Sequence, residues 1–222
     1  MYYLILIVSI AITGIAQALV SSRYNKYKKI QNNIGMTGEN VARNILDGNG
    51  LHDVQVVPVE GNLSDNYNPK TRTVNLSKDI FYGTTIASMA VAAHECGHAI
   101  QHKEQYGFLR LRSALVPVVN AASTLSYFSI FIGFLFGYIG MLEIGIVVQG
   151  IALLFELVTL PVEFNASSRA LAQLDGFNLF SQDEVKGSKK MLSAAAMTYV
   201  AALITTVLNL LRLVLILNRR RD

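Results

Sequence analysis

Three long stretches of the chain carry no charged residue: residues 1–22, 113–142 and 191–211. A helix of about 20 apolar residues crosses the hydrocarbon core of a bilayer, and each stretch is long enough to do so. Over the whole chain 52% of the residues are hydrophobic and only 15% are charged. That balance is far from the balance of a soluble protein. The sequence therefore predicts a mainly α-helical membrane protein with a modest polar domain.

The apolar region from residue 113 to residue 162 is too long for a single crossing. As one helix it would measure about 75 Å, whereas the hydrocarbon core is about 30 Å thick. We therefore expect two spans there, with a turn near Gly137 to Gly145 and an end at Leu160–Phe164. An uncleaved anchor at 1–22 and a C-terminal hydrophobic helix with a basic tail at 191–222 bring the total to about four transmembrane helices.

Basic residues follow the first apolar stretch at positions 23–29, and no acidic residue precedes Glu39. Positive charge marks the cytoplasmic side of a span, so we expect the N-terminus outside and the polar domain on the cytoplasmic side. Four crossings would place the basic residues 219–221 outside, against the same rule. The alternative is a last segment that packs on the polar domain without crossing, but the length of 191–211 favours a crossing.

The polar domain, residues 23–112, is expected to be a small α+β domain, and a second polar segment is expected at 165–190. Two segments with alternating apolar side chains predict a short β-sheet, and Pro58 places the first strand at a sheet edge. The predicted elements are a helix at Thr37–Leu46 with Thr37 as its N-cap, a strand at Val54–Val59, a turn at Asp65–Lys70 and a strand at Thr71–Ser77.

The pattern His94-Glu95-Cys96-Gly97-His98 is an H-E-x-x-H motif in a segment of helical composition. Residues four apart share one face of a helix, so His94 and His98 can bind one Zn²⁺ at about 2.0–2.1 Å each. Glu95 is offset along the helix, where it can act as a base beside the metal, as in metalloproteases. The alternative interpretation is a helix that carries two histidines on a polar face. Cys96 is interpreted as a small core residue behind the motif.

A third ligand must come from elsewhere in the chain. His102 continues the face of the two histidines, but it lies eight residues beyond His94, or about 12 Å along a helix, which is too far for one ion. Glu163 and Glu156 are the candidates, because acids in apolar segments are functional candidates by default. Their alternative interpretations are an interfacial acid for Glu163 and a helix–helix hydrogen-bonding residue for Glu156.

The motif, followed far downstream by Pro161–Ser167 (PVEFNAS), resembles the YugP-type neutral zinc metallopeptidases, which are integral-membrane proteins of bacteria. The segment Asp65–Pro69 agrees with that family, and the resemblance covers nearly the whole chain. The Glu-Phe-x-Ala part also resembles a signature of the HtpX and Ste24 membrane proteases, which implies that Glu163 is the third zinc ligand. That signature ends in an acidic residue where this chain has Ser167, so the resemblance implies no supporting role for Ser167.

The resemblance implies a membrane-embedded, zinc-dependent endopeptidase with Zn²⁺ as its cofactor and a zincin-like catalytic domain. His94, His98 and Glu163 would hold the metal, and Glu95 would be the general base for hydrolysis of a peptide bond. The active site would lie near the cytoplasmic face of the bacterial plasma membrane.

Two residues are candidates for an oxyanion donor or a supporting role, Tyr199 and Asn165. The alternative interpretation of Tyr199 is a membrane-interface tyrosine. The expected partners are a peptide or membrane-protein substrate, the lipid bilayer and a regulatory membrane partner. The sequence shows no stripe of basic residues interleaved with aromatic ones, so a nucleic-acid partner is not expected.

Two functions of other classes compete with a peptidase. One is a non-catalytic membrane scaffold or binding protein with a structural zinc, but structural sites normally have four protein ligands. No fourth ligand with suitable spacing is visible in the sequence. The other is a transporter that uses Glu143 and Glu156, but transporters usually show paired broken spans, and none is evident.

Overall fold

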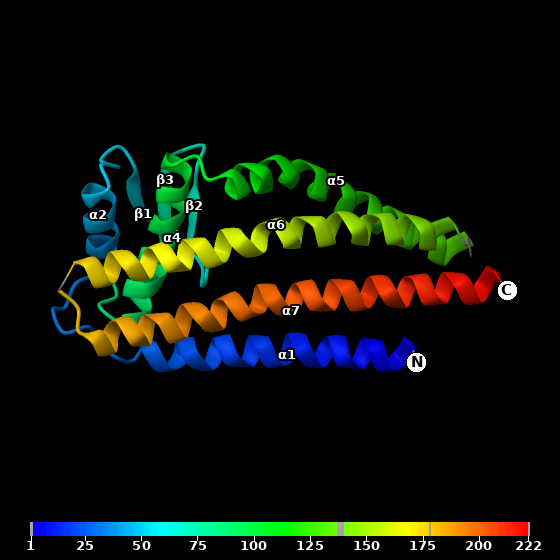
Figure 1. Cartoon of the computed structure of the whole chain (residues 1–222), viewed down its shortest axis with the longest axis horizontal. Helices are drawn as coiled ribbons and strands as arrows, with labels where there is room; N and C mark the ends of the chain where they lie inside the picture. Colours follow the sequence, from blue (N-terminus) through cyan, green and yellow to red (C-terminus); the bar gives the residue numbers. More distant parts are fainter. Residues whose placement is uncertain (1, 137–139, 178, 222) are drawn as a thin grey trace. The chain divides into compact units, whose positions relative to one another are not determined.

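The computed structural model describes residues 2–136, 140–177 and 179–221 and is mainly helical (Figure 1). Its helices are α1 (Tyr2–Tyr27), α2 (Gly38–Gly48), α3 (Lys78–Phe81), α4 (Ile86–Lys103), α5 (Gly107–Phe136), α6 (Gly140–Gly176) and α7 (Gln182–Arg221). Its strands are β1 (Gln55–Val59), β2 (Asn66–Asn68) and β3 (Thr73–Ser77).

The chain divides into two compact units, which are named here by their content. The helical unit consists of Met1–Gln17, Gly107–Pro161 and Met197–Asp222. The α/β unit consists of Ala18–Tyr106 and Val162–Ala196. Helices α1, α6 and α7 each contribute residues to both units.

The sheet of the α/β unit has the order β1-β3-β2, with β1 parallel and β2 antiparallel to β3. The central strand β3 places Val74 and Leu76 in the core, where both are fully buried. Pro58 lies on β1 at the edge of the sheet, as predicted, because proline has no N–H to donate to a second neighbouring strand.

The turn predicted at Asp65–Lys70 is wrong for its central residues, which form β2. Tyr67 pairs with Val74 of β3, and the Asn75 side chain donates a hydrogen bond to Asn66 Oδ1 at 2.9 Å. Strand pairing and the packing of Tyr67 against the core thus outweigh the turn preference of the asparagines. The turn comes later, where the Asn68 side chain accepts a hydrogen bond from the Lys70 backbone N–H.

Helix α2 packs on the motif-bearing helix α4. Thr37 is the N-cap of α2, as predicted, and its hydroxyl accepts a hydrogen bond from the Asn40 N–H at 3.2 Å. The buried face of α2 is made by Val41, Ala42, Ile45 and Leu46, and α4 opposes it with small residues, among them Ala92, Ala93, Cys96 and Ala99. The small side chains of α4 let the two helices approach closely.

The end of the second central span at Leu160–Phe164 stays a prediction, but helix α6 itself continues there through Pro161 to Gly176. The reason is a second apolar face beyond the proline. Val162, Ala166, Ala170 and Leu174 recur every four residues, and all four are fully buried in the α/β unit. This packing stabilises the helix past the position where proline disturbs its hydrogen-bond ladder.

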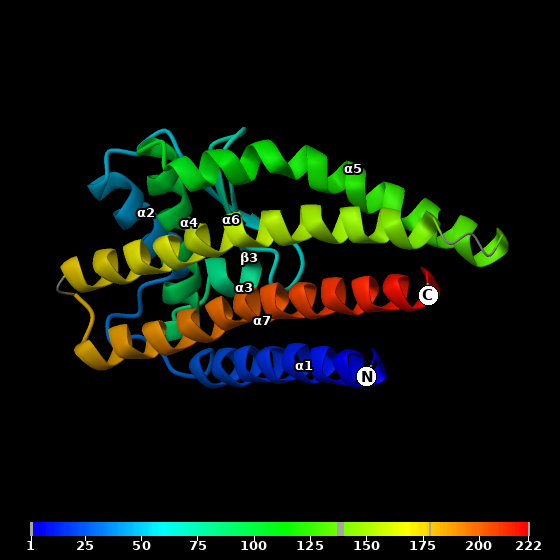
Figure 2. The ribbon, with the colours of Figure 1, turned by 45° about the vertical axis from the view of Figure 1, so that its right-hand side comes forward.

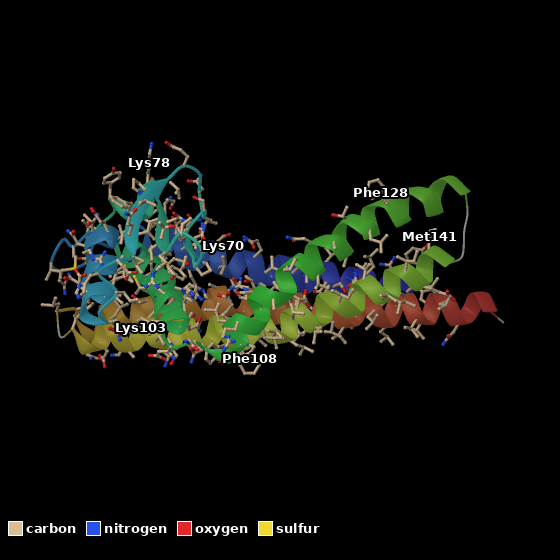
Figure 3. The ribbon with its side chains drawn as sticks, turned by 90° about the horizontal axis from the view of Figure 1, so that it is seen from above. Lys70, Lys78, Lys103, Phe108, Phe128 and Met141 are labelled. Atoms are coloured by element: carbon tan, nitrogen blue, oxygen red, sulfur yellow. The ribbon has the colours of Figure 1, made fainter. Side chains whose placement is uncertain are left out.

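Within the described residues, three helices are long and apolar enough to cross a membrane: Tyr2–Tyr27, Glu143–Gly176 and Gln182–Asn218. Their large apolar side chains project outward, with Tyr3 82% and Ile15 70% exposed. Figure 3 shows side-chain nitrogen and oxygen atoms gathered on the α/β unit, whereas carbon predominates along the helical unit. Exposed apolar surface of this extent suits lipid and not water, so the chain is that of a membrane protein.

The predicted turn between the two central spans lies partly outside the described residues. Residues 137–139 belong to that part, and α6 has already begun at Gly140. The search for spans likewise covers α5 only in part, so the count of four crossings stays a prediction.

Within the helical unit, hydrogen bonds link α7 to α1 and to α6. Helix α7 lies between the other two (Figures 1 and 2). Thr13 and Thr205 hydroxyls lie 3.3 Å apart, and Thr206 Oγ1 donates to Glu156 Oε1 at 2.9 Å. Glu156 therefore forms a hydrogen bond between two helices, which was the alternative interpretation of this residue.

We predict that Thr206→Val lowers the free energy of unfolding by about 0.5 to 1.5 kcal/mol, because it leaves the Glu156 carboxyl without its donor in an apolar setting. Unfolding of the membrane-reconstituted protein in SDS measures this loss. Thr206→Ser keeps the hydroxyl and serves as the control. Equal stability of the valine variant and the wild type would show that the bond contributes nothing.

Candidate metal centre

Helix α4 carries both histidines of the motif. It starts at an N-cap, Thr85, whose hydroxyl accepts a hydrogen bond from the Ser88 N–H at 3.1 Å. One helical turn separates His94 from His98, so their rings meet edge to face with centroids 4.8 Å apart. The two rings therefore present nitrogens toward a common point.

Glu163 of α6 reaches the same point. Its Oε2 atom lies 3.2 Å from His94 Nε2 and 3.6 Å from His98 Nε2, and the three ligand atoms all lie within 4.8 Å of one another. Three ligands at about 2.0–2.1 Å in a tetrahedral arrangement would be roughly 3.3 Å apart. The cluster thus has the dimensions of a zinc site, and its two imidazoles and one carboxylate are a zinc-type ligand set.

The electrostatics of the cluster favour a bound cation. Glu163 is only 3% exposed, and a buried carboxylate is unfavourable unless positive charge lies beside it. Burial acts to lower the pKa of His98, but the nearby carboxylates of Glu163 and Glu95 outweigh that effect, so the pKa of His98 is raised. Positive charge is therefore stabilised where the three ligand atoms converge.

The remaining candidate ligands lie elsewhere. Cys96 points to the other side of α4, where its thiol donates to Ala42 O at 3.6 Å, and burial raises the pKa of that thiol. His102 Nδ1 lies 2.8 Å from the Tyr67 hydroxyl and, as expected, is not a member of the cluster. Within the part of the chain that the structure describes, no fourth His, Cys, Asp or Glu joins the cluster.

Gln101 fixes the orientation of the His98 ring. It is fully buried, and its Oε1 lies 3.0 Å from His98 Nδ1. Its amide nitrogen donates to Val162 O and to Asn165 Oδ1, both at 2.9 Å. A hydrogen-bond partner on one ring nitrogen of a ligand histidine sets the tautomer of the ring. Gln101 is that partner on Nδ1 of His98, so Nε2 of His98 is left for a metal.

Asn165 is part of the same network. Its Oδ1 also accepts from Arg169 Nε at 2.7 Å, and Arg169 Nη2 pairs with Glu104 Oε2 at 2.6 Å. Asn165 thus contacts Gln101, which in turn contacts His98, and the supporting role of Asn165 stays a prediction.

Ser167 provides the matching contact for the other histidine. Its hydroxyl lies 3.2 Å from His94 Nδ1. Sequence reasoning assigned it no role, because the resembled signature has an acid there. The signal that could have found it is its spacing: Ser167 lies four residues after Glu163, on the same face of one helix. Gln101 was missed likewise, although it lies one turn beyond His98.

Gly97 lets α6 approach α4. A Cβ at this position would lie 2.5 Å from the backbone oxygen of Ala166, closer than atoms can come without a shift of the helix. A glycine inside a helical pattern is a sign of such close contact. The glycine thus determines how near Glu163 comes to the two histidines.

Two predicted site residues remain. Glu95 directly follows His94, and it is buried, with its carboxyl pKa raised mainly by desolvation. Tyr199 lies on α7 in the helical unit, and its proposed role stays a prediction.

Fold and site together define a membrane protein with a His-His-Glu cluster that could hold a metal ion. The comparison with known families agrees: the chain belongs to the family described as "Putative neutral zinc metallopeptidase", whose model matches residues 2–218. A relative from Bacillus subtilis (strain 168), named "Putative membrane protease YugP", is 45% identical over 222 residues, which cover 99% of each chain. No solved structure matches the chain.

We predict that Gly97→Ala weakens zinc binding at least about tenfold, because the added methyl group pushes Ala166, and with it Glu163, away from the histidines. Competition with a chromogenic chelator measures the affinity. The matched control is Gly48→Ala, where an added Cβ meets nothing within 4 Å. An unchanged zinc affinity in Gly97→Ala would mean that the helix contact does not set the site.

Replacing Gln101 by methionine keeps its size and removes its hydrogen bonds. We expect a loss of zinc affinity of about 10- to 100-fold, which is typical for partners that orient a ligand histidine. NMR of the imidazole nitrogens should also show a changed tautomer balance in His98. The exposed Gln55→Met on β1 is the control. The assignment fails if the affinity and the His98 tautomer both match the wild type.

Proposed function

We propose that this protein is a membrane-embedded zinc endopeptidase that hydrolyses peptide bonds with Glu95 as general base. The observation that carries the proposal is the cluster of His94, His98 and Glu163 on two helices, with Glu95 beside it. The family membership supports the same chemistry.

In the proposed mechanism each residue of the site has its own role. Zinc bound at such a site acts as a Lewis acid and lowers the pKa of a coordinated water to about 7. Glu95 takes the proton from the attacking water and later delivers it to the nitrogen of the departing amine. A raised pKa suits this task, because the carboxyl must hold the proton between the two steps. Gln101 and Ser167 keep the two imidazoles oriented throughout.

The oxyanion that forms on the substrate carbonyl needs a further donor, and we propose Tyr199 for this role. Asn165 is the second candidate. Its Oδ1 accepts hydrogen bonds from Gln101 and Arg169, whereas its side-chain NH2 group is the part that can donate to an oxyanion.

A catalytic site is favoured over a structural zinc in a scaffold protein. Structural sites are closed by four protein ligands, whereas catalytic ones keep a position open. Among the described residues the cluster has three ligands, which supports a site with room for water and substrate. A transporter is favoured less, because Glu156 forms a helix–helix contact with Thr206.

The proposed setting is the bacterial plasma membrane. We propose four crossings, with the zincin-like domain at residues 23–112 and the site near the cytoplasmic face. The substrates would be peptides or membrane proteins, and a regulatory membrane partner fits the same setting. The basic residues at 23–29 support this orientation.

Glu95→Gln is expected to keep stoichiometric zinc and to lower kcat by about 100- to 10,000-fold, because it removes the base and no ligand. His94→Ala and Glu163→Ala should lose both zinc and activity. Metal analysis of the purified protein and hydrolysis of a casein-derived peptide mixture measure the two properties. Loss of zinc in Glu95→Gln would overturn its role as the base, and full activity in that variant would overturn the mechanism.

A further inference from the structure

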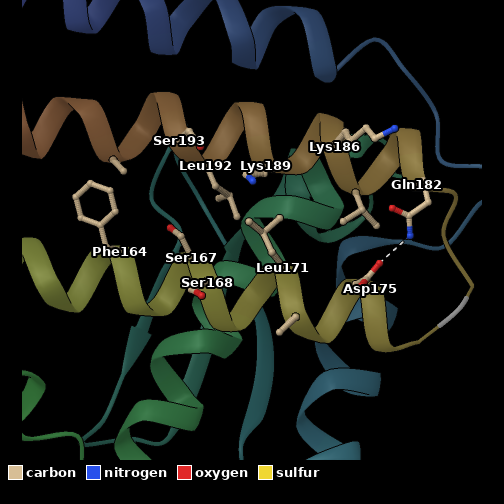
Figure 4. A pocket seen from close by; sticks show the side chains of 13 residues that line it. Phe164, Ser167, Ser168, Leu171, Asp175, Gln182, Lys186, Lys189, Leu192 and Ser193 are labelled. Carbon is tan, nitrogen blue, oxygen red and sulfur yellow. Dashed lines mark hydrogen bonds between the residues drawn. The ribbon is translucent and has the colours of Figure 1, made fainter.

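A groove of about 560 Å³ lies between α6 and α7 within the α/β unit (Figure 4). The two helix segments run antiparallel along it, from Phe164 and Ser193 at one end to Asp175 and Gln182 at the other. The second end is closed by a hydrogen bond from Gln182 Nε2 to Asp175 Oδ1 at 2.9 Å. Of the residues that line the groove, only Ser167 has a role in the proposed mechanism.

One end of the groove reaches the metal centre at His94, on the side of the ring that carries Nδ1. Phe164, which is 43% exposed, directly follows the ligand Glu163. Ser167 lines the groove, and its hydroxyl contacts His94 Nδ1. A chain lying in the groove would therefore extend away from the cluster that holds the metal.

The length of the groove corresponds to a short stretch of extended peptide. Phe164 and Asp175 are eleven residues apart on one helix, which is about 16 Å. An extended chain rises about 3.3 Å per residue, so about five residues fit. The walls combine apolar side chains, such as Leu171 and Leu192, with serine hydroxyls that can bond to a peptide backbone.

The residues that line the groove include two lysines, Lys186 and Lys189, and one acid, Asp175, so the lining carries one net positive charge. Asp175 lies at the end of the groove, where it accepts a hydrogen bond from Gln182, and Lys186 is 3.5 Å from Asp183, which does not line the groove. Lys189 lines the groove as well, and among the residues described by the structure its ammonium group has no ion-pair partner. An acidic side chain is the complement of this pair of lysines.

We propose that the groove is the substrate-binding cleft on one side of the cleaved bond. It takes an extended segment of about five residues, apolar next to the bond and carrying an acidic side chain opposite Lys186 and Lys189. The inference rests on the proposed peptidase function and adds the substrate class. A lipid chain is the less favoured occupant, because the groove shares Ser167 with the metal centre and offers serine hydroxyls to a peptide backbone.

The test uses the full chain in nanodiscs, loaded with zinc, and a peptide library made from a digested bacterial proteome. Mass spectrometry of the products reports the residues that flank each cleaved bond. We expect acidic residues to be enriched roughly two- to fivefold within five positions on one side of the bond, which is the effect of one partly exposed ion pair. The double variant Lys186→Glu, Lys189→Glu should replace this preference by one for lysine and arginine.

Lys190→Glu is the matched control, because Lys190 is exposed on the same helix but does not line the groove. Cleavage without an acidic preference, or a preference that survives the double reversal, would overturn the groove assignment and leave the peptidase intact. An effect of the reversal that depends only on anionic lipid in the nanodisc would assign the groove to lipid and also overturn it. Absence of any cleavage by the zinc-loaded wild type would instead overturn the peptidase function, and the substrate assignment with it.

Discussion

The metal centre depends on one backbone contact, the approach of α6 to α4 at Gly97. No side chain intervenes between Gly97 and the Ala166 carbonyl. Glu163 lies one turn before this contact and His94 and His98 lie on either side of it in sequence, so the three ligand atoms meet. The hydrogen bonds of Gln101 to Val162 and Asn165 cross the same junction and hold it together.

The second constraint is electrostatic. A carboxylate as buried as Glu163 requires a cation or hydrogen-bond donors, and the two imidazoles provide a place for both. Fixed partners on the far nitrogens, Gln101 Oε1 and the Ser167 hydroxyl, leave the near nitrogens for the ion. The burial of Glu163 and the hydrogen bonds of the two histidines thus both favour a positive charge at this point.

The sequence predicted much of this protein from local patterns. The uncharged stretches indicated a membrane protein, Thr37 gave the start of α2, and Pro58 gave the sheet edge, because each signal depends only on nearby residues. The turn prediction failed at Asn66–Asn68, where packing between distant segments decided the outcome: these residues became a strand by pairing with β3. Packing likewise extends α6 past Pro161, because one face of the helix from Val162 to Leu174 is buried.

By itself the sequence determined the chemical inventory of the site: two histidines one turn apart, a glutamate beside the first, and downstream acids to complete the set. Only the tertiary structure decided which acid lies with the histidines, since Glu156 contacts Thr206 while Glu163 contacts His94. It also revealed Gln101 and Ser167 as the residues that orient the rings. The physical reason is that a helical period fixes neighbours within one helix, whereas contacts between residues some 70 positions apart depend on how closely two backbones pack, which here is set by a single glycine.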